Sequence, residues 1–166
     1  DATGTADAVS LDYADGTIEA SSVTLVSTGI ETMNVSAGKG GQGVTSTLVN
    51  TNNEVSTINV TGGLLAGTGL LALGTLNKAT TTVNASTALT KISVDTAATS
   101  AVNVSAVGGY LQNITTGTGS GDVITLTSNT GTNAHTINGV SGTGDTLSLT
   151  ANSTSTDFTN VSNIDT

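Results

Sequence analysis

The sequence predicts an all-β fold, a parallel β-solenoid of the β-helix or β-roll kind, and three observations point to it. Short runs alternate apolar and polar residues, as at Val9 and Leu11 and again at Val23 and Leu25. This period of two is typical of strands with one buried face. Related phrases return about every 23 residues, and a period in the range of roughly 20–50 residues indicates stacked units. The chain also contains no Pro, which would remove hydrogen-bond donors from a strand ladder.

The first third of the chain supplies strands in regular order. After strands around 9–11 and 23–25, residues 29–36 read Gly-Ile-Glu-Thr-Met-Asn-Val-Ser, and residues 55–61 nearly repeat that phrase. Between the two phrases lies a Gly-rich turn over 38–43, and we expect a strand around 44–49 to follow it. No stretch here shows a clean helical period.

A leucine-rich stretch at residues 62–74 interrupts the pattern. Four leucines flank Gly-Thr-Gly, and the step from Val55 to the next related phrase at Leu89 is longer than the others. Because apolar runs are usually core, we expect a buried loop or short helix that covers an edge of the core. An exposed apolar patch for assembly is the alternative.

The second half of the chain repeats two kinds of phrase. One kind begins near residues 89, 111, 134 and 158, and the other begins at Asp122 and Asp145. Most steps are therefore roughly 22–24 residues long, which lies within the period range of stacked repeats. One such step fits a solenoid coil with two or three short strands. A β-sandwich stays open as the alternative, because strand spacing alone does not separate these folds.

We expect residues 1–166 to form a single β-solenoid module that is a segment of a longer repetitive chain. The phrase that begins at Asp7 is echoed near the other end by the one that begins at Asp145. Such an echo suggests a larger repeat in a parent sequence.

The charge balance excludes several partners. Three lysines stand against twelve acidic residues, for a net charge of -9, and there is no Arg. Nucleic acid is bound through clusters of Lys and Arg, so we expect no nucleic-acid partner. No apolar run approaches the ~20 residues needed to cross a bilayer, so we expect no membrane insertion. The acidic surface permits divalent cations.

The candidate metal ligands are Asp7, Asp122 and Asp145, which stand at turn–strand junctions behind small residues. Calcium prefers oxygen ligands, and these carboxylates with turn carbonyls could bind Ca²⁺ at the corners of the coils. The alternative is a turn Asp that accepts its own backbone N–H groups. The acids at 12, 15 and 19 form a second cluster. His135 has no second His or Cys nearby, and we expect it on a strand surface.

We predict that the chain is not an enzyme. The three aromatic residues, Tyr13, Tyr110 and Phe158, are too few for the platforms that usually flank a glycosidase site. No Gly-x-Ser-x-Gly nucleophile elbow is present. An ice-binding face is a minor alternative, because it would need outward Thr ladders at one position per coil, and the Thr runs at 80–82 and 115–116 are not in such register.

Residues 27–35, Ser-Thr-Gly-Ile-Glu-Thr-Met-Asn-Val, resemble a phrase of bacterial surface-layer proteins exported by type I secretion. Those proteins belong to the wider class that carries RTX calcium-binding repeats. Residues 119–124 and 142–147, which share Gly-x-Gly-Asp, are similar to half of an RTX nonapeptide, without its leading Gly-Gly and not in tandem.

The resemblance implies a secreted structural protein at the cell surface that self-associates into a surface layer, filament or matrix, with calcium as a stabilising ion. The competing expectation is an adhesin stalk or a ligand-binding module of an RTX-type surface protein. Such a stalk would be monomeric and extended, with a surface carbohydrate as a partner.

Overall fold

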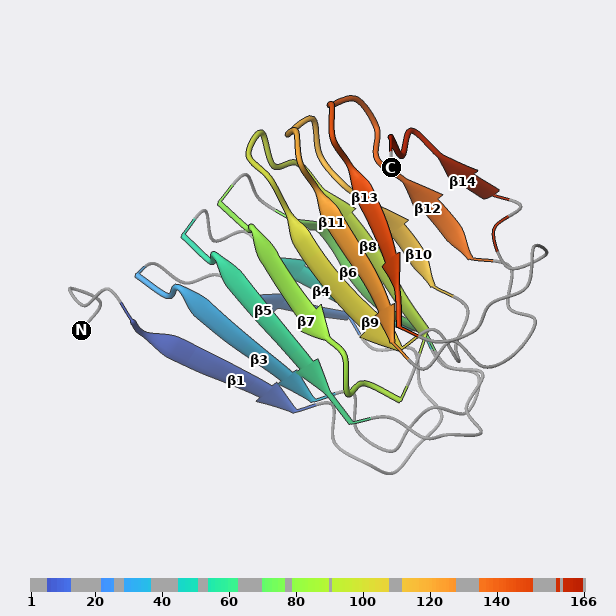
Figure 1. Ribbon diagram of the computed structural model, residues 1–166. Coiled ribbons are helices and arrows are strands. Elements are labelled where there is room, and N and C mark those ends of the chain that lie inside the picture. The colour runs from blue at the N-terminus through green and yellow to red at the C-terminus, as the bar shows by residue number, and fades with distance from the viewer. Residues whose placement is uncertain are drawn as a thin grey trace.

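The fold is built from two parallel β-sheets that lie against each other (Figure 1). The computed structural model describes residues 6–12, 22–25, 29–36, 45–50, 54–62, 70–76, 79–89, 91–107, 112–127, 135–150, 158 and 160–165, with 22–25 and 45–50 described by their backbone only. Every strand pairing in these ranges is parallel, which confirms the predicted β-solenoid. The β-sandwich alternative is wrong, because sandwiches pair their strands antiparallel.

Odd-numbered strands form one sheet, here sheet A, and even-numbered strands form the other, sheet B. Sheet A consists of β1 (Ala8–Asp12), β3 (Thr32–Ser36), β5 (Thr57–Thr61), β7 (Thr82–Ala85), β9 (Asn103–Val107), β11 (Val123–Thr127) and β13 (Thr146–Leu149). Sheet B consists of β2 (Ser22–Leu25), β4 (Thr45–Asn50), β6 (Leu70–Leu76), β8 (Lys91–Thr96), β10 (Asn113–Thr115), β12 (Thr136–Asn138) and β14 (Asn160–Ser162).

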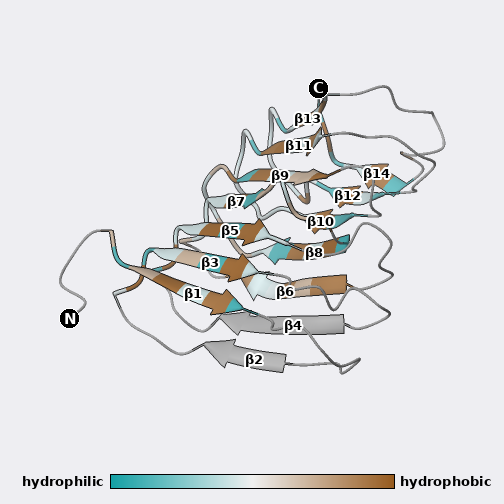
Figure 2. Ribbon diagram, turned by 90° about the horizontal axis from the view of Figure 1, so that it is seen from below, coloured by the Kyte–Doolittle hydropathy of each residue, from teal (hydrophilic) through white to brown (hydrophobic). Residues whose placement is uncertain are grey.

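Each coil uses one strand of sheet A and one strand of sheet B. Figure 2 shows the sheets as two rows, in which β1, β3 and β5 point to one side and β2 and β4 point to the other. The chain therefore runs along sheet A, turns, returns along sheet B and turns again. The expected strands around 9–11, 23–25 and 44–49 are β1, β2 and β4.

The coil length follows from the register of sheet A. Ala8 lies opposite Thr32, and six such steps carry the chain to Thr146. The mean of these steps equals the spacing predicted from the repeated phrases, so the predicted coil length is confirmed. Individual steps differ because the turns differ in length while the strands stay in register. The register also explains the echo between Asp7 and Asp145, which are six coils apart at the same position.

The alignment of the repeated phrases is corrected by the structure. The phrases at 29–36 and 55–61 lie on sheet A, whereas those near residues 89, 111 and 158 lead into β8, β10 and β14 of sheet B. The partner of Thr57 on the next coil is Thr82, so the long step from Val55 to Leu89 is no break in the repeat. The two sheets give similar phrases because strands of both need apolar residues inward and polar residues outward.

The prediction of a buried loop or short helix at 62–74 is wrong for its described part. Residues from Leu70 onward form β6, a regular strand of sheet B paired with β4 and β8. Leu71, Leu73 and Leu76 point into the core and are at most 2 % exposed. Residues 63–69 lie outside the described ranges.

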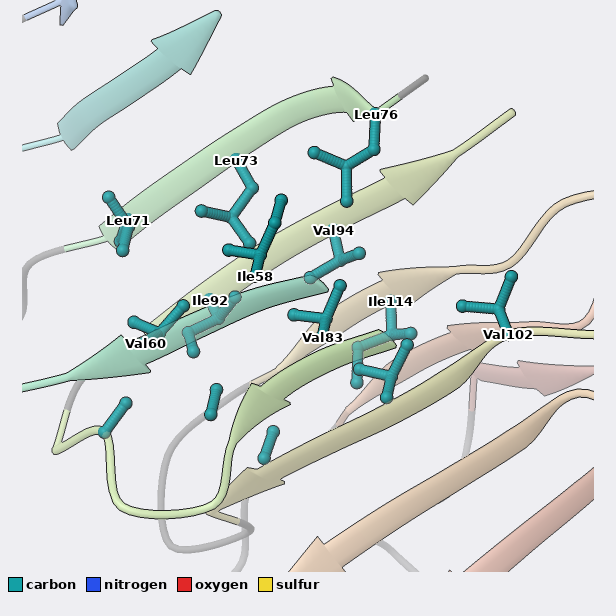
Figure 3. Close-up of a cluster of buried hydrophobic side chains, with 14 of the residues drawn as sticks. Ile58, Val60, Leu71, Leu73, Leu76, Val83, Ile92, Val94, Val102 and Ile114 are labelled. Carbon is teal, nitrogen blue, oxygen red and sulfur yellow. The ribbon is translucent and has the colours of Figure 1, made fainter. Parts of the chain in front are cut away.

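The core is a single column of apolar side chains between the sheets. Ile58, Val60 and Val83 of sheet A face leucines, Ile92 and Val94 of sheet B (Figure 3). Alternation places every second residue of a strand inside, as in the pattern of β3, where Met33 and Val35 are buried. Val, Ile, Leu and Ala fill this narrow interior, which explains how the chain manages with few aromatic residues.

Candidate functional site

The candidate site is the set of corners where the chain enters sheet A. The residue just before each sheet A strand occupies the same position in every coil, and we call this set corner A. From the first described coil to the last, corner A consists of Asp7, Glu31, Ser56, Thr81, Val102, Asp122 and Asp145. All three predicted metal ligands therefore lie at corner A. Asp122 and Asp145 are on adjacent coils, and Asp7 is at the far end of the stack.

The Gly-x-Gly-Asp phrases are two turns stacked directly on each other. A Cβ atom on Gly142 would lie 2.2 Å from the backbone oxygen of Gly119, so the close approach of the coils requires glycine there. Gly121 and Gly144 both have φ of +77°, a region that favours glycine. The Gly121 N–H donates to the Thr143 backbone oxygen at 2.9 Å, which joins the two turns. Stacking and backbone geometry thus account for both glycines of the phrase.

The aspartates of these turns join neighbouring coils. Asp122 Oδ1 accepts the Val102 N–H at 2.8 Å, and Asp145 Oδ1 accepts the Asp122 N–H at 3.0 Å. Both aspartates are 1 % exposed. At a corner the chain leaves the sheet ladder, so a buried N–H there needs another acceptor. The carboxylate of the following coil supplies it.

We call such a contact a corner clasp, in which a side chain of one coil accepts a backbone N–H of the preceding coil. The clasps recur along the stack at sequence separations of 20 to 25 residues. The pairs, written acceptor to donor, are Glu31 to Asp7, Glu54 to Gly29, Gln112 to Ile92, Asp122 to Val102, His135 to Gln112, Asp145 to Asp122 and Asp165 to Gly144.

Asp7 belongs to this system at the N-terminal end of the described stack. Its N–H donates to Glu31 Oε2 at 2.8 Å. Its own carboxylate has a buried oxygen, Oδ2, with no hydrogen-bond partner. In the other acidic clasps the carboxylate binds an N–H of the coil before it, and the described residues include no coil before that of Asp7.

His135 was expected on a strand surface, and this prediction is wrong. The ring is 0 % exposed, its Nδ1 accepts the Gln112 N–H at 3.2 Å, and it lies 6.0 Å from the Phe158 ring. Gln112 in turn accepts the Ile92 N–H through Oε1 at 2.9 Å and donates from Nε2 to the Val107 backbone oxygen at 2.8 Å. These two residues clasp the coils on the sheet B side. No local sequence pattern identifies Gln112 and His135 as clasp residues. The signal that could have identified them is their spacing of one coil.

Fit to a metal ion was tested on the described residues. They contain no group of three or more His, Cys, Asp or Glu side chains close enough to hold a metal. Calcium takes 6–8 oxygen ligands, and Oδ1 of both Asp122 and Asp145 already accepts a backbone N–H. The buried Oδ2 of Asp122 has no hydrogen-bond partner, and neither do the buried hydroxyls of Thr96 and Thr116. Carboxylates alone would therefore not complete a calcium site, and hydroxyls or backbone carbonyls would have to supply the remaining ligands.

The acids at 15 and 19 of the second predicted cluster lie outside the described residues. Asp12 is exposed at the end of β1. The structure does not bring Asp12 together with Asp122 or Asp145, which lie on β11 and β13 turns several strands away.

Fold and corners together define a two-sheet parallel β-solenoid whose coils are joined by side-chain clasps, four of them buried. Comparison with models of protein families, with curated proteins and with solved structures gave no match. The described residues include no helix long and apolar enough to cross a membrane.

Proposed function

We propose that this chain is a structural module of a secreted cell-surface protein that self-assembles into a surface layer, filament or matrix. The observation that carries the proposal is the edge-to-edge repetition of the coils, in which each coil pairs with the next through a strand of each sheet. Among the described strands, β1, β2, β13 and β14 are the ones that pair on one side only. Unpaired edges of this kind are docking sites that natural proteins cover unless association is intended.

The apolar residues at the ends support association. Val9 and Leu11 at one end are only half-buried, as are Leu147, Val161 and Ile164 at the other. Leu149 is 38 % exposed, although its position in the strand faces the core. Burying such surface contributes roughly 25 cal/mol per Å² of apolar area.

The geometry of the ends supports head-to-tail stacking. Each internal junction joins the C-terminal edge of one coil to the N-terminal edge of the next, so the two ends of a copy are complementary by construction. A contact between unlike surfaces does not close on itself and produces an open filament. The Asp7 carboxylate, whose Oδ2 has no hydrogen-bond partner, would meet the terminal coil of the neighbouring copy.

Charge supports a dependence on cations. Asp7 and Asp12 lie at one end, Asp165 lies at the other, and the whole chain carries -9. Like charges oppose stacking unless ions screen or bridge them. Ca²⁺ is the bridging ion we propose, since hard oxygen ligands are what the ends offer. The extracellular, cell-surface location rests on the resemblance of residues 27–35 to surface-layer proteins.

Electron microscopy of the protein after dialysis against EDTA, and then against millimolar CaCl₂, tests this function. Matched MgCl₂ and NaCl samples at equal ionic strength separate calcium bridging from general screening. We expect filaments or layers with CaCl₂ only. Assembly in all salts would retain the structural role and remove calcium as the switch.

A pair of variants locates the contact. Leu149→Asp places a charge at the open C-terminal end and should abolish assembly. Thr118→Asp adds the same charge on an exposed turn away from both ends and should not. Equal assembly of the two variants would contradict stacking through this end.

An adhesin stalk or ligand-binding module is the second candidate, and the regular stack of coils favours it as a rigid spacer. Single rods under every salt condition would support this function in place of assembly. Retention of such rods on an immobilised surface carbohydrate would then identify the ligand class.

A further inference from the structure

The outer face of sheet A is free of charged side chains over six neighbouring strands. From β3 to β13, its outward positions carry only Thr, Ser, Asn and Val, although the chain as a whole carries twelve acids. We call this surface the neutral face. It consists of Thr32, Asn34, Ser36, Thr57, Asn59, Thr61, Thr82, Asn84, Asn103, Ser105, Val107, Val123, Thr125, Thr127, Thr146, Ser148 and Thr150. Charge on the outer faces of the described strands is confined to Asp12 of β1 in sheet A and to Lys91 and Asp95 of β8 in sheet B. No other run of neighbouring described strands without charge is as long as the neutral face.

We propose that the neutral face is a lateral contact surface for a second copy of this chain. This inference rests on the proposed function, since it names the contact that would turn filaments into a layer. Two copies that each carry -9 repel one another, and the repulsion is smallest where they meet through a surface without charge.

Covering the side chains of the neutral face with a second copy costs little free energy. Thr, Ser and Val are short and have few rotamers, so ordering them costs little conformational entropy. Several polar groups also have partners within the chain already. Asn59 Nδ2 donates to Asn34 Oδ1 at 2.9 Å, and Thr127 Oγ1 donates to the Ala106 backbone oxygen at 3.3 Å. Removing such groups from water costs less than removing unpaired ones.

The size of the face predicts the order of assembly. The six strands are four or five residues long. At ~3.3 Å per residue and ~4.8 Å between strands, they give a footprint of roughly 400–500 Å². A stable interface buries about 800 Å² on each partner, so one pair of copies would associate only weakly. Copies joined end to end present the face repeatedly, and the linked contacts add. Lateral association should therefore follow filament formation.

The composition of the face argues for a second copy over two other occupants. Thr32, Thr57 and Thr82 stack in one column, but Asn103 and Val123 continue it, so the Thr ladder expected of an ice-binding face covers three coils only. The face offers no aromatic side chain on which a sugar ring could stack.

Matched charge variants test the contact. The double variant Asn84→Asp, Ser105→Asp places two charges on the neutral face, at paired positions of adjacent strands in the middle of the stack. The control, Asn113→Asp, Ser93→Asp, makes the same two changes at paired positions of adjacent strands on the outer face of sheet B, also away from both ends. Circular dichroism and melting curves establish that both variants fold.

The readout is negative-stain electron microscopy under the salt that assembles the wild type. We expect layers from the wild type and the control, and single filaments from Asn84→Asp, Ser105→Asp. Layers from that variant overturn the lateral contact, and so do single filaments from the wild type. If the wild type forms single filaments, pelleting with cellulose decides the alternative. Wild-type filaments that pellet and variant filaments that do not would assign the neutral face to a polysaccharide. A wild type that never assembles rejects the proposed function, and the contact with it.

Discussion

The clasp between Asp122 and the Val102 N–H leads to a prediction that can be worked out from the structure. Asp122→Ala removes the only acceptor shown for that N–H, on a buried corner, and leaves the donor unpaired. Removing the acceptor so that a buried donor stays unpaired costs about 1–3 kcal/mol, and the upper part of this range applies to a hydrogen bond with a charged group. We therefore expect a loss of about 2–3 kcal/mol in the free energy of unfolding. At about 2–4 °C per kcal/mol for a chain of this length, the melting temperature should fall by about 4–12 °C.

Asp122→Asn separates the clasp from calcium binding. The amide retains an oxygen that can accept the Val102 N–H, but it loses the charge at the buried Oδ2, which has no hydrogen-bond partner. In EDTA we expect this variant to melt close to the wild type. If calcium binds Asp122, adding CaCl₂ should raise the melting temperature of the wild type and leave that of Asp122→Asn unchanged.

Amide hydrogen exchange gives a local readout. A solenoid can unfold in parts, so a global melting temperature can miss a weakened corner. Exchange at the Val102 N–H should accelerate in Asp122→Ala and stay slow in Asp122→Asn. Unchanged exchange and melting in Asp122→Ala would refute the clasp, and an Asp122→Asn variant as unstable as Asp122→Ala would show that the charge matters more than the hydrogen bond.

Three further variants test other corners, with urea unfolding followed by circular dichroism as the common measurement. Gly142→Ala should destabilise by more than about 2 kcal/mol, because its Cβ would overlap the Gly119 oxygen; wild-type stability would show that the turns can move apart. Val140 has φ of 59°, which is strained for a β-branched residue, so Val140→Asn should stabilise by about 1 kcal/mol; a loss would show that Val140 packing outweighs strain. His135→Leu should cost about 1–3 kcal/mol, because the Gln112 N–H loses its acceptor; a neutral result would assign the ring to packing only.

Features that depend on one strand and its neighbours in sequence were predictable. Alternation of polar and apolar residues located β1, β2 and β4, and the return of related phrases gave the length of a coil. Both signals arise because every coil has to bury one face of each strand against the same column. These signals do not show to which sheet a strand belongs, because β5 of sheet A and β8 of sheet B both need apolar residues inward and polar residues outward. The stretch that begins at Leu70 was not predicted as a strand for a related reason. Its outward positions include Leu70 and Ala72, and apolar residues on both faces hide the period of two.

The corner residues were predictable in position but not in role. A carboxylate placed where a turn meets a strand can bind a cation or a backbone N–H, because both interactions use the same oxygen lone pairs. Local sequence cannot separate the two, since the donor of the clasp lies one coil earlier, 20 residues away for Asp122. His135 illustrates the same limit, as its neighbours in sequence say nothing of the Gln112 N–H, which comes from 23 residues before it.

The clasps also give the stack a direction that bears on assembly. In every clasp the side chain belongs to the later coil and the N–H to the earlier one. One end of a stack therefore presents an acceptor, as Asp7 does, and the other end presents the final coil that follows Asp145. Two copies that meet by their N-terminal ends would bring acidic acceptors together, and two that meet by their C-terminal ends would form no clasp. Copies that meet by unlike ends could extend the same ladder. The polarity of the clasps thus favours filaments in which all copies point the same way, and an equal frequency of head-to-head contacts in micrographs would contradict it.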